Sequence, residues 1–279
     1  MLPMNNDVTF TRFVHPDTGI VSTFIKNRSL WQPLGNFLFD NDLCLAIGEG
    51  QVAELNSDDR LHAPFVDLVT TVPSAFVKTH NVILAEEVES YPEPRRESLL
   101  SSPITSRTGK LEFIEFLSSA QLTSARSDQR LTSQTWARFI ENLKPNFPPE
   151  KGDKYTRSQA PFFANVLTLQ QMVGIHDAFL QKFAGKAATI KFDVFRSAQL
   201  MSYFVFYKYY LAGHEPKPPN DFGDAFQLHA LPYCKLAIME RGMCEVLQQI
   251  KKNTNLLNGV VVKNIDFLKD WNWEEEGES

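Results

Sequence analysis

The stretch from Asn220 to Glu240 reads N-D-F-G-D-A-F-Q-L-H-A-L-P-Y-C-K-L-A-I-M-E. It predicts a helix that starts at Asp221 and ends before Pro232. A short apolar strand, Cys234–Met239, follows, and Glu240 stands at its carboxyl end. A helix that alternates with a short apolar strand is typical of α/β proteins, whose parallel sheets are covered by helices.

The segments after this stretch continue the alternation. Residues 241–252 predict a further helix, and residues 259–262 predict a further strand. In open α/β sheets, functional groups lie beyond the carboxyl ends of the strands. We therefore expect Glu240 at such an edge, with Asp221 and Asp224 from the preceding helix start beside it.

This region resembles the C-terminal part of PIN-like nucleases. The matching features are an Asp-x-x-Asp helix start at Asp221 and Asp224, a Leu-Pro-Tyr segment at 231–233, and a strand that ends in the acid Glu240. The last acid is often Asp in those proteins, and a longer glutamate changes the site geometry. The resemblance implies a three-layer α/β/α fold with a central, mostly parallel sheet, and single-stranded RNA as the substrate.

The resemblance also implies a metal-binding aspartate at the end of the first strand. The apolar run Phe37–Phe39 predicts that strand, because a short continuous apolar run fits a strand buried on both faces. Asp40 ends the run and is the expected ligand, with Asp42 as the alternative. Either aspartate could instead cap a following helix, which is predicted to run through Leu45.

A second strand is predicted over residues 81–84, directly before a run of glutamates. PIN-like proteins place a glutamate on a helix near this point, and Glu87 or its neighbour Glu86 would serve. The alternative is a solvated first helical turn, where carboxylates interact favourably with the helix dipole.

Close carboxylates repel one another, and hard divalent cations relieve that repulsion. We therefore expect Mg²⁺ or Mn²⁺ as the cofactor. The resemblance to PIN-like nucleases implies a metal-dependent endoribonuclease, and a toxin, defence or RNA-processing role is compatible with it. The expected metal ligands are Asp40, Asp224 and Glu240, and the expected catalytic residues are Asp40, Glu87, Asp221, Asp224 and Glu240.

The remaining segments predict additions to a single PIN-like domain. Residues 8–24 are rich in Thr, Val and Phe around a Pro-Asp-Thr-Gly turn, which predicts a β-hairpin in an N-terminal extension, 1–33. Core parts 34–92 and 162–270 flank a helical insertion with loops, 93–161, and an acidic tail, 271–279, follows. The hairpin or the insertion could bind a protein partner or a second copy of the chain.

The insertion is the expected RNA-binding surface. Residues 107–157 hold nine Lys or Arg and six Asp or Glu, whereas the whole chain has a net charge of −5. Cationic side chains neutralise phosphates, although an ordinary mixed-charge surface is the alternative. The candidate contacts are Arg126, Arg130, Arg138, Lys151, Lys154 and Arg157.

Composition narrows the class of protein. The chain of 279 residues is 43% hydrophobic, enough for a sizeable core. Its three cysteines lack C-x-x-C spacing and its six histidines lack ligand spacing, so we expect neither a disulfide framework nor a zinc site, and a cytoplasmic location. The most apolar run, Met201–Leu211, contains Lys208 and is too short to cross a membrane.

Two other functions fit parts of the sequence. The run F-L-F-D-N-D-L resembles the nucleophile motif of haloacid dehalogenase-like phosphohydrolases, with Asp40 as nucleophile and Asp42 as acid/base. Leu43 and Cys44 depart from that family's pattern, and the later acidic pair follows a proline loop where the family has a strand. The third hypothesis is a PIN-like interaction module without catalysis, whose acids are caps and surface groups.

Overall fold

The computed structural model describes residues 12–55, 59–104, 138–150, 154–175, 190–215 and 220–272, together with residues 109, 111, 113–115, 152, 179 and 274. For residue 59 and residues 220–222, only the backbone is described.

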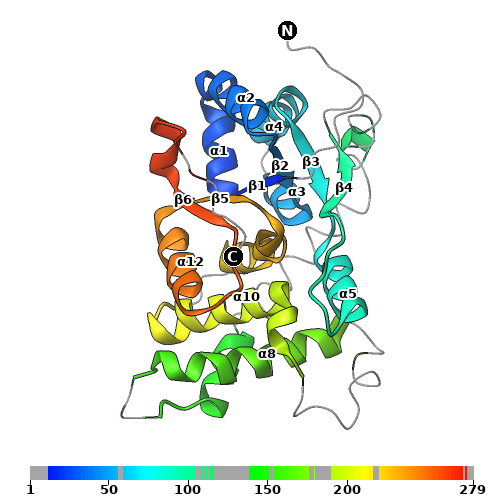
Figure 1. The fold of residues 1–279 in the computed structure, drawn as a ribbon. Helices are drawn as coiled ribbons and strands as arrows, with labels where there is room; N and C mark the ends of the chain where they lie inside the picture. Colours follow the sequence, from blue (N-terminus) through cyan, green and yellow to red (C-terminus); the bar gives the residue numbers. More distant parts are fainter. Residues whose placement is uncertain are drawn as a thin grey trace.

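A six-stranded sheet forms the middle layer, in the order β4-β3-β2-β1-β5-β6 (Figure 1). Strand β1 pairs in parallel with both β2 and β5, and β2–β3 and β5–β6 are also parallel pairs. Strand β4 runs antiparallel to β3. The parallel strands therefore share a carboxyl edge and an amino edge. The strands are β1 (Phe13–Pro16), β2 (Cys44–Ile47), β3 (Ser74–Val77), β4 (Leu100–Pro103), β5 (Leu236–Met239) and β6 (Val261–Asn264).

Helices cover both faces of this sheet (Figure 1). Alternate strand residues point to opposite faces. Val14 and Ile238 pack among helices α1, α2 and α4, whereas Ala237 and Met239 pack among α10, α11 and α12. The helices are α1 (Thr18–Lys26), α2 (Trp31–Asp40), α3 (Glu49–Leu55), α4 (Asp59–Thr71), α5 (His80–Ser90), α8 (Ala160–Ile175), α10 (Arg196–Val205), α11 (Asn220–Gln227) and α12 (Arg241–Asn253).

Shorter helical segments connect these elements. Helix α10 continues directly into a π-helical segment, Phe206–Leu211. The 3₁₀ segments are Arg28–Leu30, Lys144–Asn146, Arg157–Gln159, Phe192–Val194, Leu228–Tyr233 and Ile265–Lys269.

The predicted α/β class and the mostly parallel sheet are confirmed. The predicted strand over residues 234–239 is β5, and the predicted strand over 259–262 overlaps β6. The helix predicted from Arg241 is α12, and the helix start at Asp221 lies in α11. Among the described residues, no helix is both long enough and apolar enough to span a bilayer.

The predicted N-terminal hairpin is wrong. Residues 13–16 form β1, which lies between β2 and β5 in the sheet, and the chain then enters helix α1. The Pro16-Asp17 pair marks a helix start, because the side chain of Asp17 accepts a hydrogen bond from the backbone of Ile20. Ile20, Val21 and Phe24 then form a buried helical stripe despite their high strand propensity. Strand β1 and helix α1 therefore belong to the core of the fold and do not form an N-terminal extension.

The strand predicted at Phe37–Phe39 is also wrong, because these residues belong to helix α2. Leu34, Phe37 and Leu38 are buried, whereas Phe39 is 63% exposed. This is the i, i+3, i+4 pattern of a helix with one buried face. The helix predicted to run through Leu45 is instead strand β2.

The strand predicted over residues 81–84 lies in helix α5. Ile83, Leu84 and Val88 are buried, and Val82 is 44% exposed, which again fits helical spacing. The neighbouring strand of the sheet is β3, which was not predicted from the sequence.

Candidate active site

Asp17 follows the carboxyl end of β1, which lies between β2 and β5 in the sheet. Its Oδ1 accepts a hydrogen bond of 2.8 Å from the amide of Ile20, and its Oδ2 accepts one from the amide of Glu240. The carboxylate therefore caps helix α1 and joins the ends of β1 and β5. Burial raises the pKa of Asp17 to about 6, with repulsion from Glu240 and Asp224 adding to the shift and the two amides opposing it.

Glu240 follows the last residue of β5 and is the N-cap residue of α12. Its side chain lies against the backbone of Gly19 in the first turn of α1. A Cβ atom at Gly19 would come within 2.0 Å of Glu240 Oε1. The absence of a side chain at Gly19 therefore lets the exposed carboxylate of Glu240 approach Asp17.

Glu54 comes from helix α3, which follows β2. Gln227 Nε2 lies 3.3 Å from Glu54 Oε2 and 2.6 Å from Thr18 Oγ1, so this amide joins helices α3, α11 and α1. Burial raises the pKa of Glu54, and repulsion from Asp224 and Glu240 acts in the same direction, while hydrogen bonds from Thr18 and Gln227 oppose it. Glu54 is thus held toward the same edge as Glu240.

Asp224 lies in α11 and pairs with a lysine. Lys208 Nζ is 3.3 Å from Asp224 Oδ2, and the two side chains are 19% and 40% exposed. Lys208 belongs to the π-helical segment and also lies over the rings of Phe204 and Tyr209, at 5.2 and 5.6 Å from their centroids. Such segments occur frequently at functional sites, because the extra residue redirects a side chain.

Together, Asp17, Glu54, Asp224 and Glu240 bring four carboxylates from four elements to one edge, with Lys208 beside them. Oxygen donors of this kind suit Mg²⁺ or Mn²⁺, and a cation would offset the repulsion that raises the pKa of Asp17. The donor chemistry therefore fits a hard divalent ion. As the side chains stand, no three acidic, histidine or cysteine residues in the described part of the chain converge as a ligand set.

Asp40 does not belong to this edge. It is the last residue of α2, and the chain enters β2 at Cys44, so Asp40 lies at the amino edge, opposite Asp17. Asp42, with φ of 53°, lies in the same connection. The predicted ligation of one ion by Asp40 and Asp224 is therefore wrong. Both aspartates of the phosphohydrolase hypothesis, Asp40 and Asp42, lie at this amino edge.

Glu87 is also separate from the carboxyl edge. It is fully buried, and its Oε1 accepts hydrogen bonds from the amide of Ser197 at 2.7 Å and from the hydroxyl of Tyr233 at 2.5 Å. Tyr233 precedes β5, so this contact lies toward the amino edge. Burial raises the pKa of Glu87 to about 7. The alternative, Glu86, pairs with Lys78 and Arg95.

Two of the other predicted site residues lie at the acidic edge, and several lie outside the described residues. Asp224 and Glu240 interact electrostatically with the same two acids, Asp17 and Glu54. The side chain of Asp221 lies outside the described residues, as do Arg126, Arg130 and Lys151. The described candidates for phosphate contact are exposed: Arg138, Lys154 and Arg157.

Burial raises the pKa of Tyr207, and Arg157 lies close enough to that tyrosine to oppose part of the shift. Tyr207 and Lys208 are neighbours in the π-helical segment. This segment therefore connects the described end of the insertion with the acidic edge.

Three histidines, His15, His80 and His229, are buried in the core. The rings of His80 and His229 are 5.7 Å apart, and His229 Nδ1 is 2.6 Å from the carbonyl oxygen of Phe226. Burial lowers the pKa of His15 and of His80 to about 3, and repulsion from His229 adds to both shifts. These side chains are neutral core groups at physiological pH.

Sequence reasoning missed Asp17 and Glu54. Asp17 follows the run T-R-F-V-H-P, and the proline directs attention to a turn. Glu54 lies in E-G-Q-V-A-E-L, which is separated from the apolar run C-L-A-I by Gly48 alone. The available signal was an acid shortly after each of the apolar runs that form β1 and β2.

Comparisons with protein-family models, with curated proteins and with solved structures found no match to this chain.

Proposed function

We propose that the chain is a metal-dependent nuclease that cleaves single-stranded RNA at the carboxyl edge of β1 and β5. The observation that supports this proposal is the meeting of Asp17, Glu54, Asp224 and Glu240 at one edge from four separate elements. Their order along the chain follows the PIN-like pattern, with an acid after the first strand, on an early helix, at a late helix start and after a late strand. The choice of RNA follows from that resemblance.

Glu54, Asp224 and Glu240 would hold the cation. A bound Mg²⁺ or Mn²⁺ ion supplies Lewis-acid stabilisation of the charge that develops on the phosphate. Asp17 has both oxygens committed to backbone amides, so its role is to position Glu240 and the start of α1. Gln227 positions Glu54 through its shared hydrogen bonds with Thr18.

Lys208 gives the site a cationic group at the acidic edge. Its ammonium group pairs with Asp224 and lies on the segment that also contacts the insertion. An RNA phosphate that approaches this edge would meet repulsion from four acids, and Lys208 offsets part of it. The exposed Arg157 lies close to Tyr207, the neighbour of Lys208 in the π-helical segment, and would extend the phosphate path.

The test is cleavage of an end-labelled, unstructured RNA with Mn²⁺, with Mg²⁺ and with a chelator. We expect metal-dependent cleavage by the wild type and a loss of at least about 100-fold in Glu54→Gln and Asp224→Asn, since charge stabilisation of a transition state contributes several kcal/mol. Asp40→Asn is the matched control, because it removes a carboxylate at the opposite edge. Equal cleavage by all variants, or cleavage that survives the chelator, would contradict the proposal.

A non-catalytic interaction module is the second candidate. It is favoured by the commitment of Asp17 to helix capping and strand joining, which needs no chemistry. This candidate predicts no cleavage in any metal and no change in melting temperature when Mn²⁺ is added, because isolated caps do not bind the ion.

A further inference from the structure

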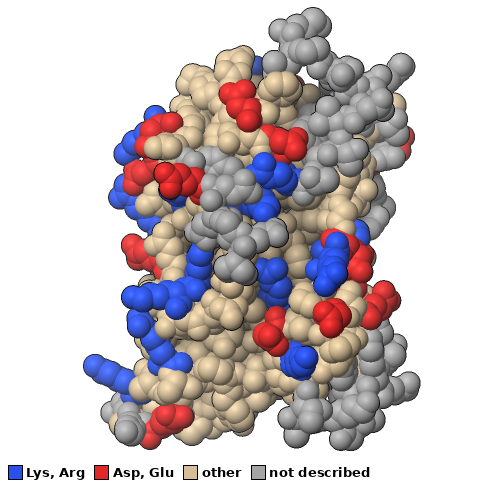
Figure 2. Space-filling view, viewed as in Figure 1, with Lys and Arg blue, Asp and Glu red and all other residues tan. Residues whose placement is uncertain are grey.

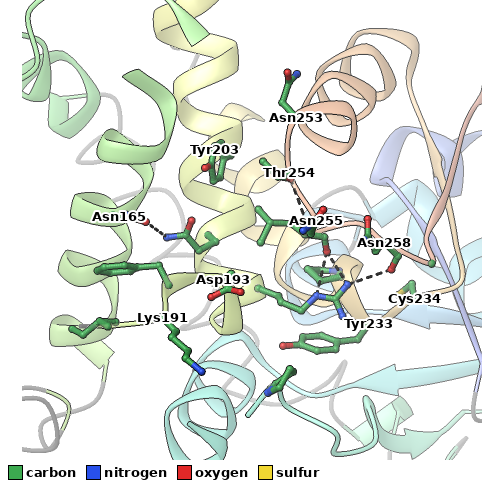
Figure 3. A pocket seen from close by; sticks show the side chains of 18 of the residues that line it. Asn165, Lys191, Asp193, Tyr203, Tyr233, Cys234, Asn253, Thr254, Asn255 and Asn258 are labelled. Atoms are coloured by element: carbon green, nitrogen blue, oxygen red, sulfur yellow. Dashed lines mark hydrogen bonds between the residues drawn. The ribbon is translucent and has the colours of Figure 1, made fainter. Parts of the chain in front are cut away.

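A cavity of about 840 Å³ lies at the amino edge of β5 and β6, opposite the acidic edge. Figure 3 shows its walls: helix α8 with Asn165, helix α10 with Tyr203, the segment before β5 with Tyr233, and the turn after α12 with Asn255 and Asn258. Sites for small molecules have volumes of roughly 300–1,000 Å³. The cavity is therefore large enough for a ligand of the size of a nucleotide.

Contacts among the lining residues hold the walls in place. Arg196 Nη2 donates to the carbonyl oxygen of Leu256 at 2.8 Å and lies 3.4 Å from that of Asn258, which fixes the turn after α12 (Figure 3). The Arg196 guanidinium also lies 5.6 Å from the ring centroid of Tyr233, and the hydroxyl of Tyr233 donates a hydrogen bond to Glu87. A cavity fixed in this way needs little ordering when a ligand binds.

Amide side chains line much of the surface. Gln199 is buried, and its Nε2 donates to Asn165 Oδ1 at 3.1 Å and to Thr168 Oγ1 at 2.9 Å. Asn253, Asn255 and Asn258 lie on the facing wall (Figure 3). An amide both donates and accepts hydrogen bonds, which is what the edge of a nucleobase requires.

The charge of the lining favours an anion. Lys191, Arg196 and Lys235 line the cavity, and Asp193 is the one acid among the lining residues of the described chain. On the molecular face in Figure 2, Lys and Arg side chains also gather over the region of α12. Cationic side chains in a partly enclosed site bind phosphate more strongly than they do in open solvent.

An aromatic surface completes the site. Tyr203 is half-buried on α10, and Figure 3 shows its ring at the upper wall, between α8 and α12. Tyrosine rings stack on nucleobases of any sequence. Lys191 stands at the other end of the view, so base and phosphate contacts are separated across the cavity.

We propose that this cavity binds a mononucleotide, with its phosphate toward Lys191 and Lys235 and its base toward Tyr203 and the amide side chains. Inorganic phosphate would make no contact with the amides and the ring, and a nucleoside would bring no negative charge to the cationic part of the lining. The site lies across the sheet from the acids and does not depend on the nuclease activity.

The test is calorimetric titration of the full chain with AMP, GMP, CMP and UMP, in EDTA so that the acidic edge carries no metal. We expect at least one mononucleotide to bind at micromolar concentration, and its nucleoside and inorganic phosphate each to bind at least about tenfold more weakly. Lys191→Ala and Tyr203→Leu should each weaken binding at least about fivefold. Lys252→Ala, an exposed change on α12 outside the cavity, should leave the affinity unchanged.

Circular dichroism and the melting temperature verify that each variant is folded. The proposal is overturned if no mononucleotide binds at 1 mM, or if folded Lys191→Ala and Tyr203→Leu both bind as the wild type does. Equal affinity for phosphate and for the mononucleotides would also overturn it, because the base would then make no contribution.

Discussion

The backbone amide of Glu240 donates a hydrogen bond to Oδ2 of Asp17, across 223 positions of the chain. The same carboxylate caps helix α1 through Ile20. One side chain thus joins the ends of the neighbouring strands β1 and β5 and brings the carboxylate of Glu240 to the first turn of α1. The acidic edge is built around this contact.

Replacement of Asp17 should therefore reduce stability as well as activity. Asp17→Ala removes a helix cap and leaves the amide of Glu240 without its acceptor, so we expect the free energy of unfolding to fall by about 1–3 kcal/mol. Asp17→Asn keeps an acceptor oxygen and should lose less. Urea denaturation monitored by circular dichroism measures the free energy of unfolding of both variants. An alanine variant as stable as the wild type would show that this contact contributes little.

Gly19→Ala should displace Glu240 without unfolding the protein. The new Cβ would meet the carboxylate of Glu240, which is exposed and must move away. We expect weaker Mn²⁺ stabilisation and slower cleavage, with the free energy of unfolding within about 1 kcal/mol of the wild type, because alanine favours the helix. Gly242→Ala is the matched control, since no atom lies within 4 Å of the position of its added Cβ. If the two variants show the same Mn²⁺ stabilisation and the same cleavage rate, the carboxylate of Glu240 is not part of the site.

Lys208→Met should weaken RNA binding more than it weakens the fold. The pair with Asp224 is partly exposed, so its loss should cost about 0–1 kcal/mol of stability. If Lys208 contacts a phosphate, the slope of log affinity against log salt should become shallower by about 0.7. Fluorescence anisotropy with a labelled RNA over a series of salt concentrations measures this slope. An unchanged slope would place the phosphate path elsewhere.

Glu87→Gln should change how stability depends on pH. The pKa of Glu87 rises from 4.5 to about 7 in the folded protein, so the neutral form is favoured there. Its stabilising contribution is complete below about pH 4.5 and is lost as the pH rises through about 7. Asp17 and Glu54 act in the same direction, so the wild type should lose stability between these pH values.

Glu87→Gln should lose less stability than the wild type does as the pH rises from about 4.5 to about 7. Glu89→Gln, an exposed change on the same helix, should follow the wild type. Parallel curves for Glu87→Gln and the wild type, from urea denaturation at a series of pH values, would contradict the raised pKa.

The C-terminal half of the fold could be predicted because its signals are local. The apolar run of β5 is bounded by Pro232 on one side and Glu240 on the other, and α12 has a continuous amphipathic pattern. Asp224 and Glu240 could be assigned to one edge because parallel strands share it. The class of fold follows from this alternation alone.

The N-terminal half could not be predicted because tertiary contacts override its local signals. Strand β1 has four residues, and its partners β2 and β5 are distant in the sequence. The residues of α1 favour strands in isolation and become helical because one face packs on the sheet. Asp17 was missed for that reason. Asp40 was chosen because Phe37–Phe39 is a short apolar run that resembles a strand, and the sequence does not show that Phe39 is exposed.

The most direct test of the central claim is a crystal structure of the wild-type protein soaked in Mn²⁺, with anomalous diffraction recorded to locate the ion. The account predicts an anomalous peak bounded by the carboxylates of Glu54, Asp224 and Glu240, at oxygen distances of about 2.0–2.6 Å. A peak at Asp40 or Glu87, or no peak at the carboxyl edge at saturating Mn²⁺, would contradict it.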